Sequence, residues 1–377
     1  MTTTVNNEQK KLNVPNLRFK EFQGEWEKCT LEDVINFSTT RVNSSELNKD
    51  NYVSTENMLQ DYQGIVKAKS VPEDVNVVSF SCGDILISNI RPYLKKVWKA
   101  TFNGGCSSDV FVLKANDNIE SDYLHYVIAN DKFINFVMSG AKGVKMPRGD
   151  KKQMETYSLS LPQIQEQHKI ARLISLLDER IATQNKIIDK LQSLIKGISS
   201  RIFASIQGIE YRMGDIVTIT NGNSNVQDTV TQSKDGLYPF FDRSEDIKYL
   251  PTFLFDKEAI IYPGEGTEFM PRYFKGKFAL HQRCYAIFDF NEIINARFLY
   301  FYLKTRNSYF VKNAVGSTVP SLRLDTFQKL KVIIPSKKIQ HSVSLCLSSM
   351  EQKCNVEKKI LHKLLKQKQY LLRQMFI

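Results

Sequence analysis

The fold is decided by residues 162–203, PQIQEQHKIARLISLLDERIATQNKIIDKLQSLIKGISSRIF. A related stretch follows at residues 335–376, PSKKIQHSVSLCLSSMEQKCNVEKKILHKLLKQKQYLLRQMF. At an offset of 173 residues, Gln167–His168 matches Gln340–His341 and Phe203 matches Phe376. A repeat of this length predicts two similar structural units within one chain.

Both copies carry an apolar seam in which steps of four and three residues alternate. In the first copy the seam positions are Ile170, Ile174, Leu177, Ile181, Gln184, Ile188, Leu191, Ile195, Ile198 and Ile202. In the second they are Val343, Leu347, Met350, Cys354, Glu357, Leu361, Leu364, Lys368, Leu371 and Met375. This is the 3.5-residue period of a coiled coil, and the polar residues Gln184 and Glu357 fall at matching positions.

One interpretation of each seam is an ordinary amphipathic helix packed on its own domain. A second interpretation is that the two seams bury each other. A seam of this length spans about 50 Å at 1.5 Å per residue, which is longer than most domain cores are wide. The repeat therefore favours two long helices packed together as an antiparallel coiled coil that serves as a spacer.

The region before each helix reads as a mixture of strands and helices. We expect strands at 77–80, 84–88 and 110–113 and one helix over 123–138; the second region repeats this order with strands at 259–262 and 284–288 and a helix around 298–311. Terminal strands at 157–161 and 330–334 then lead into the long helices. The predicted fold class is α+β, with two pseudo-symmetric repeats that each consist of a mixed head and a long helix.

The formal net charge is +12 and the sequence pI is about 9.2. Such an excess favours an anionic partner, most simply nucleic acid, although an ordinary basic surface is the alternative. No apolar run approaches the roughly 20 residues of a membrane-spanning helix, and the polar start, Met1–Lys11, lacks the apolar core of a signal peptide. The six cysteines contain no C-x-x-C pair. We therefore expect free thiols, a cytoplasmic protein and no membrane partner.

Basic residues cluster at several places in the two heads. The loop 139–148, SGAKGVKMPR, carries three cations on a glycine-rich backbone and aligns with 313–322, NAVGSTVPSL. Lysines and arginines so placed can contact phosphates, and arginine can also bind a guanine edge; a solvated turn is the alternative. The candidate DNA-binding residues are Arg91, Lys95, Lys96, Lys142, Lys145, Arg148, Arg243, Arg272, Lys275, Arg283, Lys312 and Arg323.

Motifs of catalysis are missing from the sequence. There is no G-x-x-x-x-G-K-[ST] loop for ATP and no N-P-P-[FY] or D-P-P-Y tetrapeptide of the kind that holds a flipped adenine. We identify no nuclease-like pair of carboxylates and no histidines at metal-ligand spacing. The sequence predicts a non-catalytic chain without a catalytic, cofactor or metal site of its own.

The sequence resembles the DNA-specificity subunits of type I restriction–modification enzymes. The opening 14–19, VPNLRF, followed by Gly24-Glu-Trp26 and 31–34, LEDV, is similar to the entry into the first target-recognition domain of that family. Residues 161–170, LPQIQEQHKI, followed by 173–178, resemble the family's central region, and Ile334-Pro335 with Gln340-His341 is a degraded copy. The second copy departs from the first at 336–339, SKKI against QIQE, which bears on the contacts of the last helix.

The resemblance implies a domain order for the whole chain. It predicts an N-terminal arm (1–20), target-recognition domain 1 (21–162), a central spacer helix (163–206), target-recognition domain 2 (207–335) and a C-terminal spacer helix (336–377). Each head would read one half of a split site in double-stranded DNA, and the helices would set the gap.

The resemblance also implies partners. Two methyltransferase subunits would dock on the helices, and restriction/translocase subunits would join them. S-adenosylmethionine, ATP and Mg²⁺ would belong to those partners. Because both helices keep similar starts, the candidate docking residues are Gln167, Lys169, Arg172 and Gln340. Two alternatives stay open: a non-enzymatic DNA-binding scaffold or regulator with a dimerising coiled coil, and a self-contained methyltransferase or nuclease.

Overall fold

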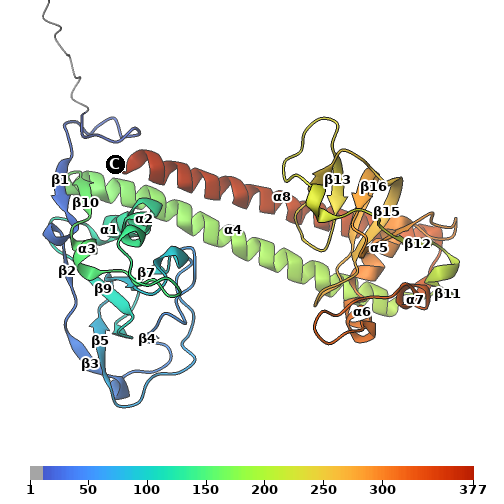
Figure 1. Cartoon of the computed structure of the whole chain (residues 1–377), viewed down its shortest axis with the longest axis horizontal. Helices are drawn as coiled ribbons and strands as arrows, with labels where there is room; N and C mark the ends of the chain where they lie inside the picture. Colours follow the sequence, from blue (N-terminus) through green and yellow to red (C-terminus); the bar gives the residue numbers. More distant parts are fainter. Residues whose placement is uncertain (1–11) are drawn as a thin grey trace, which may run out of the picture. The chain divides into compact units, whose positions relative to one another are not determined.

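The computed structural model describes residues 12–377, so residues 1–11, more than half of the predicted N-terminal arm, lie outside the described residues. The chain divides into two compact units. Unit 1 extends to Thr183 and also takes in Leu361–Ile377, whereas unit 2 consists of Gln184–Ile360. The two long helices, α4 (Ile164–Ser205) and α8 (Lys337–Met375), each contribute to both units (Figure 1).

The two units share one order of elements. Unit 1 and the helix that leaves it contain β1 (Glu27–Thr30), the 3-10 turn η1 (Leu31–Asp33), β2 (Ile35–Phe37), β3 (Arg41–Asn43), η2 (Ser44–Glu46), β4 (Tyr52–Val53), β5 (Asn76–Phe80), β6 (Ile85–Ser88), η3 (Pro92–Leu94), β7 (Val97–Lys99), β8 (Gly104–Cys106), β9 (Val110–Ala115), α1 (Ser121–Ile128), α2 (Asp131–Ser139), α3 (Lys151–Glu155), β10 (Ser158–Leu161) and α4. Unit 2 contains β11 (Ile209–Arg212), η4 (Met213–Asp215), β12 (Thr218–Asn221), η5 (Val226–Asp228), β13 (Tyr238–Phe241), β14 (Lys248–Leu250), β15 (Phe255–Pro263), β16 (Arg272–Leu280), β17 (Cys284–Phe288), α5 (Ala296–Lys304), α6 (Asn307–Asn313), α7 (Leu324–Gln328), β18 (Lys331–Ile334) and α8.

The sheets show where the two heads agree and where they differ. A four-stranded arrangement, β2-β9-β6-β7 in unit 1 and β12-β17-β15-β16 in unit 2, has the same strand order in both. Unit 2 extends this sheet beyond β16 with β13 and β14, whereas unit 1 builds a separate sheet in the order β3-β5-β8-β4. A two-stranded antiparallel pair, β1-β10 or β11-β18, leads into each long helix. The common scaffold therefore carries different additions in each head.

Each expected head helix is in fact two helices. The expected helix over 123–138 breaks between α1 and α2, because the side chain of Asn130 accepts a hydrogen bond from Lys132 N and starts a new helix. In unit 2 the expected helix around 298–311 breaks between α5 and α6, where Thr305 Oγ1 donates to Tyr302 O. Asn, Asp, Ser and Thr favour helix ends because their side chains compete for backbone groups.

The long helices complete the core of each unit. In unit 1, Ile170 and Ile174 of α4 lie in one apolar cluster with Leu371, Met375 and Phe376 from the end of the chain. The ring of Phe376 stacks on Tyr123 of α1 at a centroid distance of 5.2 Å. Burial of such side chains is the main favourable contribution to folding. The last residues of the chain are therefore part of the first head.

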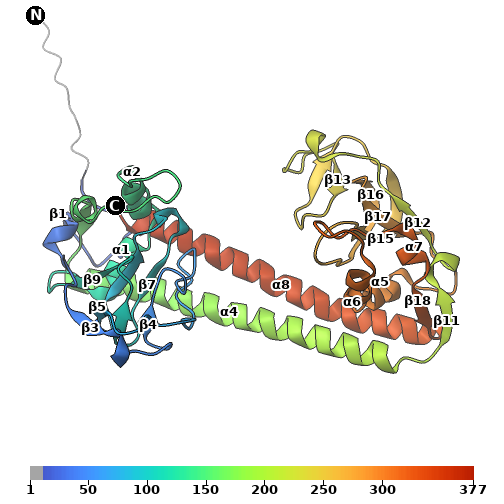
Figure 2. The same cartoon turned by 60° about the horizontal axis from the view of Figure 1, so that its bottom comes forward.

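Unit 2 has the equivalent arrangement with the roles of the helices exchanged. Phe203 near the end of α4 packs against Phe298 and Tyr302 of α5, each at a centroid distance of 5.5 Å. Leu347 near the start of α8 belongs to the same cluster. In both units, then, the start of one long helix lies beside the end of the other (Figures 1 and 2). The helices are antiparallel, and the predicted α+β fold with two pseudo-symmetric repeats is confirmed.

The two polar seam residues meet each other. Gln184 and Glu357 are 8% and 7% exposed, and Gln184 Nε2 donates to Glu357 Oε2 at 2.5 Å and to Glu357 O at 3.2 Å. Lys353 Nζ contacts the other carboxylate oxygen of Glu357 at 2.5 Å. Hydrogen bonds from Lys353 and Gln184 hold the pKa of Glu357 below its ordinary value. The seam therefore contains a satisfied polar pair, formed between positions that match in the repeat.

All six cysteines are free; Cys82 and Cys346 are exposed, and Cys106, Cys284 and Cys354 are buried. No helix within residues 12–377 is both long enough and apolar enough to cross a membrane. The same residues contain no group of three or more His, Cys, Asp or Glu side chains that could hold a metal ion.

Candidate nucleic-acid interface

Three segments lie against one another where the central strands β6 and β9 of the β2-β9-β6-β7 sheet meet their loops. The segment after β6 contacts the glycine-rich loop, with Arg91 N donating to Pro147 O at 2.7 Å and Gly149 N donating to Asn89 O at 2.8 Å. Asn89 N donates in turn to the carbonyl oxygen of Asp109, just before β9, at 2.9 Å. We call these segments, 89–95, 107–109 and 141–149, the reading surface of unit 1.

The glycine-rich loop is a short hairpin closed by two backbone hydrogen bonds between Lys142 and Arg148, at 2.9 and 3.0 Å. Gly143 has a φ of +95°, and a Cβ there would lie 3.2 Å from Met146 O. Glycine is favoured at such a position because it has no Cβ. The hairpin therefore has a defined shape and presents Val144 and Lys145 at its tip.

The predicted cations of unit 1 gather on or beside this surface. Arg91 and Lys145 are exposed, Lys142 contacts Asp150 at 2.8 Å, and Arg148 contacts Asp109 at 3.4 Å. Lys95 Nζ lies 2.8 Å from Asp131 Oδ1. Lys96 Nζ donates to Thr55 O at 2.5 Å, and burial, assisted by Arg91, lowers the pKa of Lys96. Exposed ion pairs exchange readily for phosphate, because solvent screens them.

Exposed apolar side chains accompany these cations. Tyr93 and Met146 are each 47% exposed, and the Val144 side chain is fully exposed. The turn with Tyr93 is held by Arg91 and Lys95, which both have left-handed backbones with φ of +49° and +53°. Apolar side chains can contact a thymine methyl group or a base step. From the sequence, Tyr93 could belong either to the core or to a contact surface, and nothing distinguished Val144 and Met146, because residue type alone does not separate exposed from buried positions.

Unit 2 has a reading surface in the same place, made of 264–270, 281–283 and 314–322. Leu322 N donates to Gly264 O at 2.8 Å, Gly266 N to Pro320 O at 3.0 Å and Gly264 N to Arg283 O at 2.9 Å. The loop is again a hairpin, closed between Val315 and Ser321. Gly264-Glu-Gly266 is thus a turn beside this loop.

The side chains on this second surface differ from those on the first. In unit 1 the acid Asp109 precedes β9 and meets Arg148, whereas in unit 2 the base Arg283 precedes β17 and meets Glu265 at 2.8 Å. The polarity of the ion pair is therefore reversed. Two surfaces of one geometry with different charges suit recognition of two different targets.

The structure distributes the remaining candidates of unit 2 more widely. Lys312 and Arg323 are exposed and flank the 314–322 loop. Arg243 is exposed after β13, and Lys275 is exposed in the middle of β16. Arg272 Nη2 donates to Asp242 O at 2.8 Å and also to Ser244 O. Arg283, Lys312 and Arg323 therefore lie on or flank the three segments of the reading surface, whereas Arg243, Arg272 and Lys275 lie outside these segments.

Two candidate docking residues, Gln167 and Gln340, have buried side chains that form hydrogen bonds within the fold. Gln167 is 1% exposed; its amide donates to Pro162 O and Asn118 O, and its Oε1 accepts from Glu120 N. Gln340, also 1% exposed, makes the same contacts with Pro335 O, Ile293 O and Asn295 N. Each glutamine ties the start of a long helix to the start of a head helix, because a buried amide needs partners.

Lys169 and Arg172 lie on the outer face of α4. Lys169 contacts Glu21 and lies above the rings of Phe19 and Phe22, at 5.3 and 5.7 Å from their centroids. Arg172 Nη1 lies 3.6 Å from Glu179 Oε1, and its side chain is 66% exposed. Arg172 is therefore the more available of the two cations.

A known protein family matches this sequence in two places. The sequence profile of the family "Type I restriction modification DNA specificity domain" matches residues 23–193 and again residues 209–366. The chain belongs to this family. The profile occurs in two copies, in agreement with the two repeats.

Curated members of the specificity family match parts of the chain. The type I restriction enzyme EcoDI specificity subunit of Escherichia coli is 28% identical over 138 residues, or 37% of this chain and 30% of that protein. The MjaVIII specificity subunit of Methanocaldococcus jannaschii is 35% identical over 101 residues, or 26% of this chain and 23% of that protein. These alignments span less than a third of either relative.

Solved structures match the chain over nearly its whole length. The S subunit of the type I restriction–modification system of M. genitalium has a TM-score of 0.66 at 17% identity, covering 97% of this chain and 99% of that one. A chain from a structure of the type I R-M system has a TM-score of 0.54 at 15% identity, covering 92% and 96%. At these identities the likeness establishes the specificity-subunit fold.

Proposed function

We propose that this chain is the sequence-specific DNA recognition subunit of a type I restriction–modification complex. It would read a bipartite site with two heads and dock methyltransferase and restriction subunits. The observation that supports this most directly is the pair of reading surfaces, which share backbone hydrogen bonds and differ in side chains. The chain itself would be non-catalytic.

Each head would combine two kinds of contact. Lysines and arginines on the reading surfaces contact phosphates and supply affinity that falls as salt rises. A few side chains from the loop tips contact base edges and supply specificity. Each lost base contact costs about 1–3 kcal/mol, so two heads discriminate far better than one.

The long helices would act as the spacer between the two half-sites. They have 42 and 39 residues, or roughly 60 Å each at 1.5 Å per residue. One turn of B-DNA spans about 34–36 Å, so helices of this length suit a gap of a helical turn or more. The gap would follow from helix length rather than from base contacts.

The partners would supply the chemistry. Two methyltransferase subunits would bring S-adenosylmethionine and methylate adenine N6, and restriction/translocase subunits would bring ATP and Mg²⁺. The assembly would act on DNA in the cytoplasm. In this chain the exposed face of α4 around Lys169 and Arg172 would contact a methyltransferase subunit, whereas Gln167 and Gln340 would position the helix starts.

Reversal of charge at Arg172 is expected to weaken methyltransferase binding at least several-fold. Arg172→Glu changes an exposed side chain and leaves the apolar cluster of unit 1 intact. Lys169→Glu should weaken binding too, but it also disturbs Glu21 and the two phenylalanines. Pull-down with the methyltransferase measures the effect, with Lys186→Glu, about four turns further along α4 and also exposed, as the control. Retained binding in the Arg172 variant would remove this residue from the docking face.

Removal of three cations from the unit 1 hairpin is expected to impair one half-site only. The variant Lys142→Gln, Lys145→Gln, Arg148→Gln should reduce the slope of log K against log salt by about 2–3, or roughly 0.9 per lost phosphate contact. The control variant Lys186→Gln, Lys190→Gln, Lys196→Gln removes the same charge from the exposed side of α4 and should keep the slope.

Methylome sequencing of a host that carries the chain with its methyltransferase provides the second readout. The wild-type chain should direct adenine methylation at a bipartite site, and the hairpin variant should alter or relax one half of it. Tight DNA binding without any methylation pattern would favour the non-enzymatic scaffold instead. Equal loss at both half-sites would contradict separate reading by two heads.

A further inference from the structure

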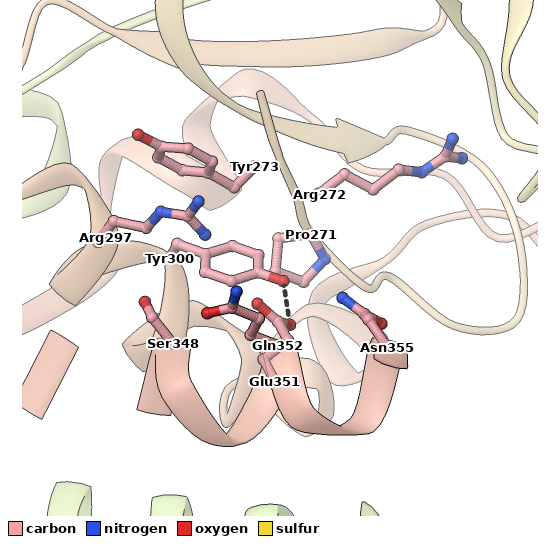
Figure 3. Close-up of a pocket in the computed structure, with 9 residues that line it drawn as sticks. All are labelled: Pro271, Arg272, Tyr273, Arg297, Tyr300, Ser348, Glu351, Gln352 and Asn355. Carbon is pink, nitrogen blue, oxygen red and sulfur yellow. Dashed lines mark hydrogen bonds between the residues drawn. The ribbon is translucent and has the colours of Figure 1, made fainter. Parts of the chain in front are cut away.

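Unit 2 contains a polar pocket that none of the contacts described above uses. It has a volume of about 500 Å³ and lies between the start of β16, helix α5 and the first half of α8. Arg272, Tyr273, Arg297 and Tyr300 come from the head, and Ser348 and Glu351 are among the residues that come from α8 (Figure 3). The segment 264–270 of the reading surface leads directly into Pro271 at its rim. The pocket therefore adjoins the second reading surface along the chain.

The pocket contains a guanidinium without a counter-ion. Arg297 Cζ lies 3.6 Å from the centroid of the Tyr273 ring, and no carboxylate within residues 12–377 forms an ion pair with it. Tyr273 donates its hydroxyl hydrogen bond to Glu258 and stays neutral as a stacking platform. An arginine stacked on an aromatic ring keeps its N–H edge free for a planar or tetrahedral anion.

The acid in the pocket is already compensated. Glu351 Oε1 accepts from Tyr300 Oη and from Lys304 Nζ, both at 2.8 Å. Arg272 also lines the pocket, with its guanidinium pointing away from Arg297 (Figure 3) and its Nη1 buried without a hydrogen-bond partner among the described residues. Ser348 and the amides further along α8 face this space as neutral donors (Figure 3). The balance of the pocket is positive.

The equivalent place in unit 1 is closed by ion pairs. Lys99 is the equivalent of Tyr273, because Lys99 pairs with Ile85 in the sheet as Tyr273 pairs with Ile260. Asp122 is the equivalent of Arg297, because each lies two residues after the N-cap of its helix. There Lys99 Nζ contacts Asp122 directly. On the adjoining helix, Asp178 takes the place of Glu351 and contacts Lys368 at 2.6 Å. Where unit 1 has the Lys99–Asp122 ion pair, unit 2 has Arg297 stacked on Tyr273, a cation without an ion-pair partner among the described residues.

The geometry points to an oxyanion site in this pocket, with Arg297 as the principal ligand and a phosphate group of the DNA backbone as its occupant. This assignment rests on the proposed function, since it places DNA at the adjoining reading surface. Arginine is suited to phosphate because two parallel N–H groups can bind two oxygens. The site would anchor the second head on the duplex without reading a base.

Salt-dependent binding of the full chain to a labelled 30-base-pair duplex of random sequence tests the assignment. Arg297→Gln should reduce the slope of log K against log salt by about 1. Arg297→Lys keeps the charge and should keep most of the slope. Arg306→Gln is the matched control, because Arg306 Cζ also lies over a tyrosine ring, Tyr302, at 4.4 Å but outside the pocket. Glu351→Gln removes a negative charge and should tighten binding.

A second measurement separates DNA phosphate from free phosphate. The melting temperature of each variant is compared in sodium phosphate and in sodium chloride at equal ionic strength. Phosphate should stabilise the wild-type chain and the Arg306→Gln variant more than Arg297→Gln. If this stabilisation depends on Arg297 while the DNA slope does not, the site holds a free phosphate rather than the backbone.

Separate results would overturn the oxyanion site and the proposed function. If Arg297→Gln changes neither the DNA slope nor the response to phosphate, the oxyanion site is overturned. If the wild-type chain fails to bind any duplex, the proposed function fails, and the phosphate measurement still decides the chemistry of the pocket.

Discussion

Lengthening both spacer helices by one turn is expected to widen the unread gap of the DNA target by about one or two base pairs. Four added residues extend an α-helix by about 6 Å, and one base pair rises about 3.4 Å. The insertions belong after Gln184 in α4 and before Glu357 in α8. Since the helices are antiparallel, insertions at those points face each other and leave the Gln184–Glu357 pair intact. Four residues turn the helix by about 400°, so the apolar seam returns close to its original face.

The half-sites should stay the same in the lengthened protein, because neither reading surface is changed. Mapping the methylated adenines before and after the insertion measures the gap directly. An insertion in α4 alone is the control: it leaves four residues unmatched and should weaken the helix pair rather than lengthen the gap cleanly. An unchanged gap in the doubly lengthened protein would refute the spacer role.

The matched substitutions Phe203→Ala and Phe376→Ala are expected to have the largest effects on stability. Phe203 is 4% exposed and packs on two aromatic rings of α5, so its loss should cost unit 2 about 3–5 kcal/mol. Phe376 is 6% exposed and stacks on Tyr123, with its carbonyl oxygen accepting from Lys132 Nζ at 3.1 Å. Its loss should cost unit 1 a similar amount, about 3–5 kcal/mol.

Hydrogen exchange resolves the two units in this experiment. Phe203→Ala should speed exchange in α5, and Phe376→Ala should speed exchange in α1. Leu194→Ala, at a side chain that is 52% exposed, is the control and should do neither. Equal loosening of both head helices by either substitution would contradict the separate contributions of the two helix ends.

The long helices could be predicted closely from sequence because a seam repeated over many turns has few structural solutions. The repeated stretches 162–203 and 335–376 compare with helices at 164–205 and 337–375 in the structure. The secondary structure of the two heads is less evident from the sequence. Breaks near Asn130 and Thr305 depend on single side-chain hydrogen bonds, which periodicity does not reveal. Strand β16 is not evident from the sequence, because its lysines and arginine interrupt the apolar alternation that is typical of a strand.

The candidate site shows a similar division. In unit 1 the hairpin motif and the cluster after β6 were each visible in the sequence, and the fold brings them together. Their juxtaposition with Asp109 depends on a long-range backbone contact that sequence spacing does not show. Gln167 and Gln340 stood out because they match across the repeat, yet their buried contacts give a folding reason for that match. The difference at Arg297 is recognised only when equivalent residues of the two repeats are matched through the register of their sheets.

The Gln184–Glu357 contact also bears on which long helices pair with each other. Both residues occupy one position of an internally duplicated sequence, so the like helices of two molecules offer an alternative to the pairing of α4 with α8. Two first helices paired with each other would set glutamine against glutamine, and two second helices would set carboxylate against carboxylate, with repulsion between them. Only unlike copies give the amide-to-carboxylate hydrogen bond. A single residue difference at the midpoint thus disfavours dimers in which two copies of the same long helix pair with each other.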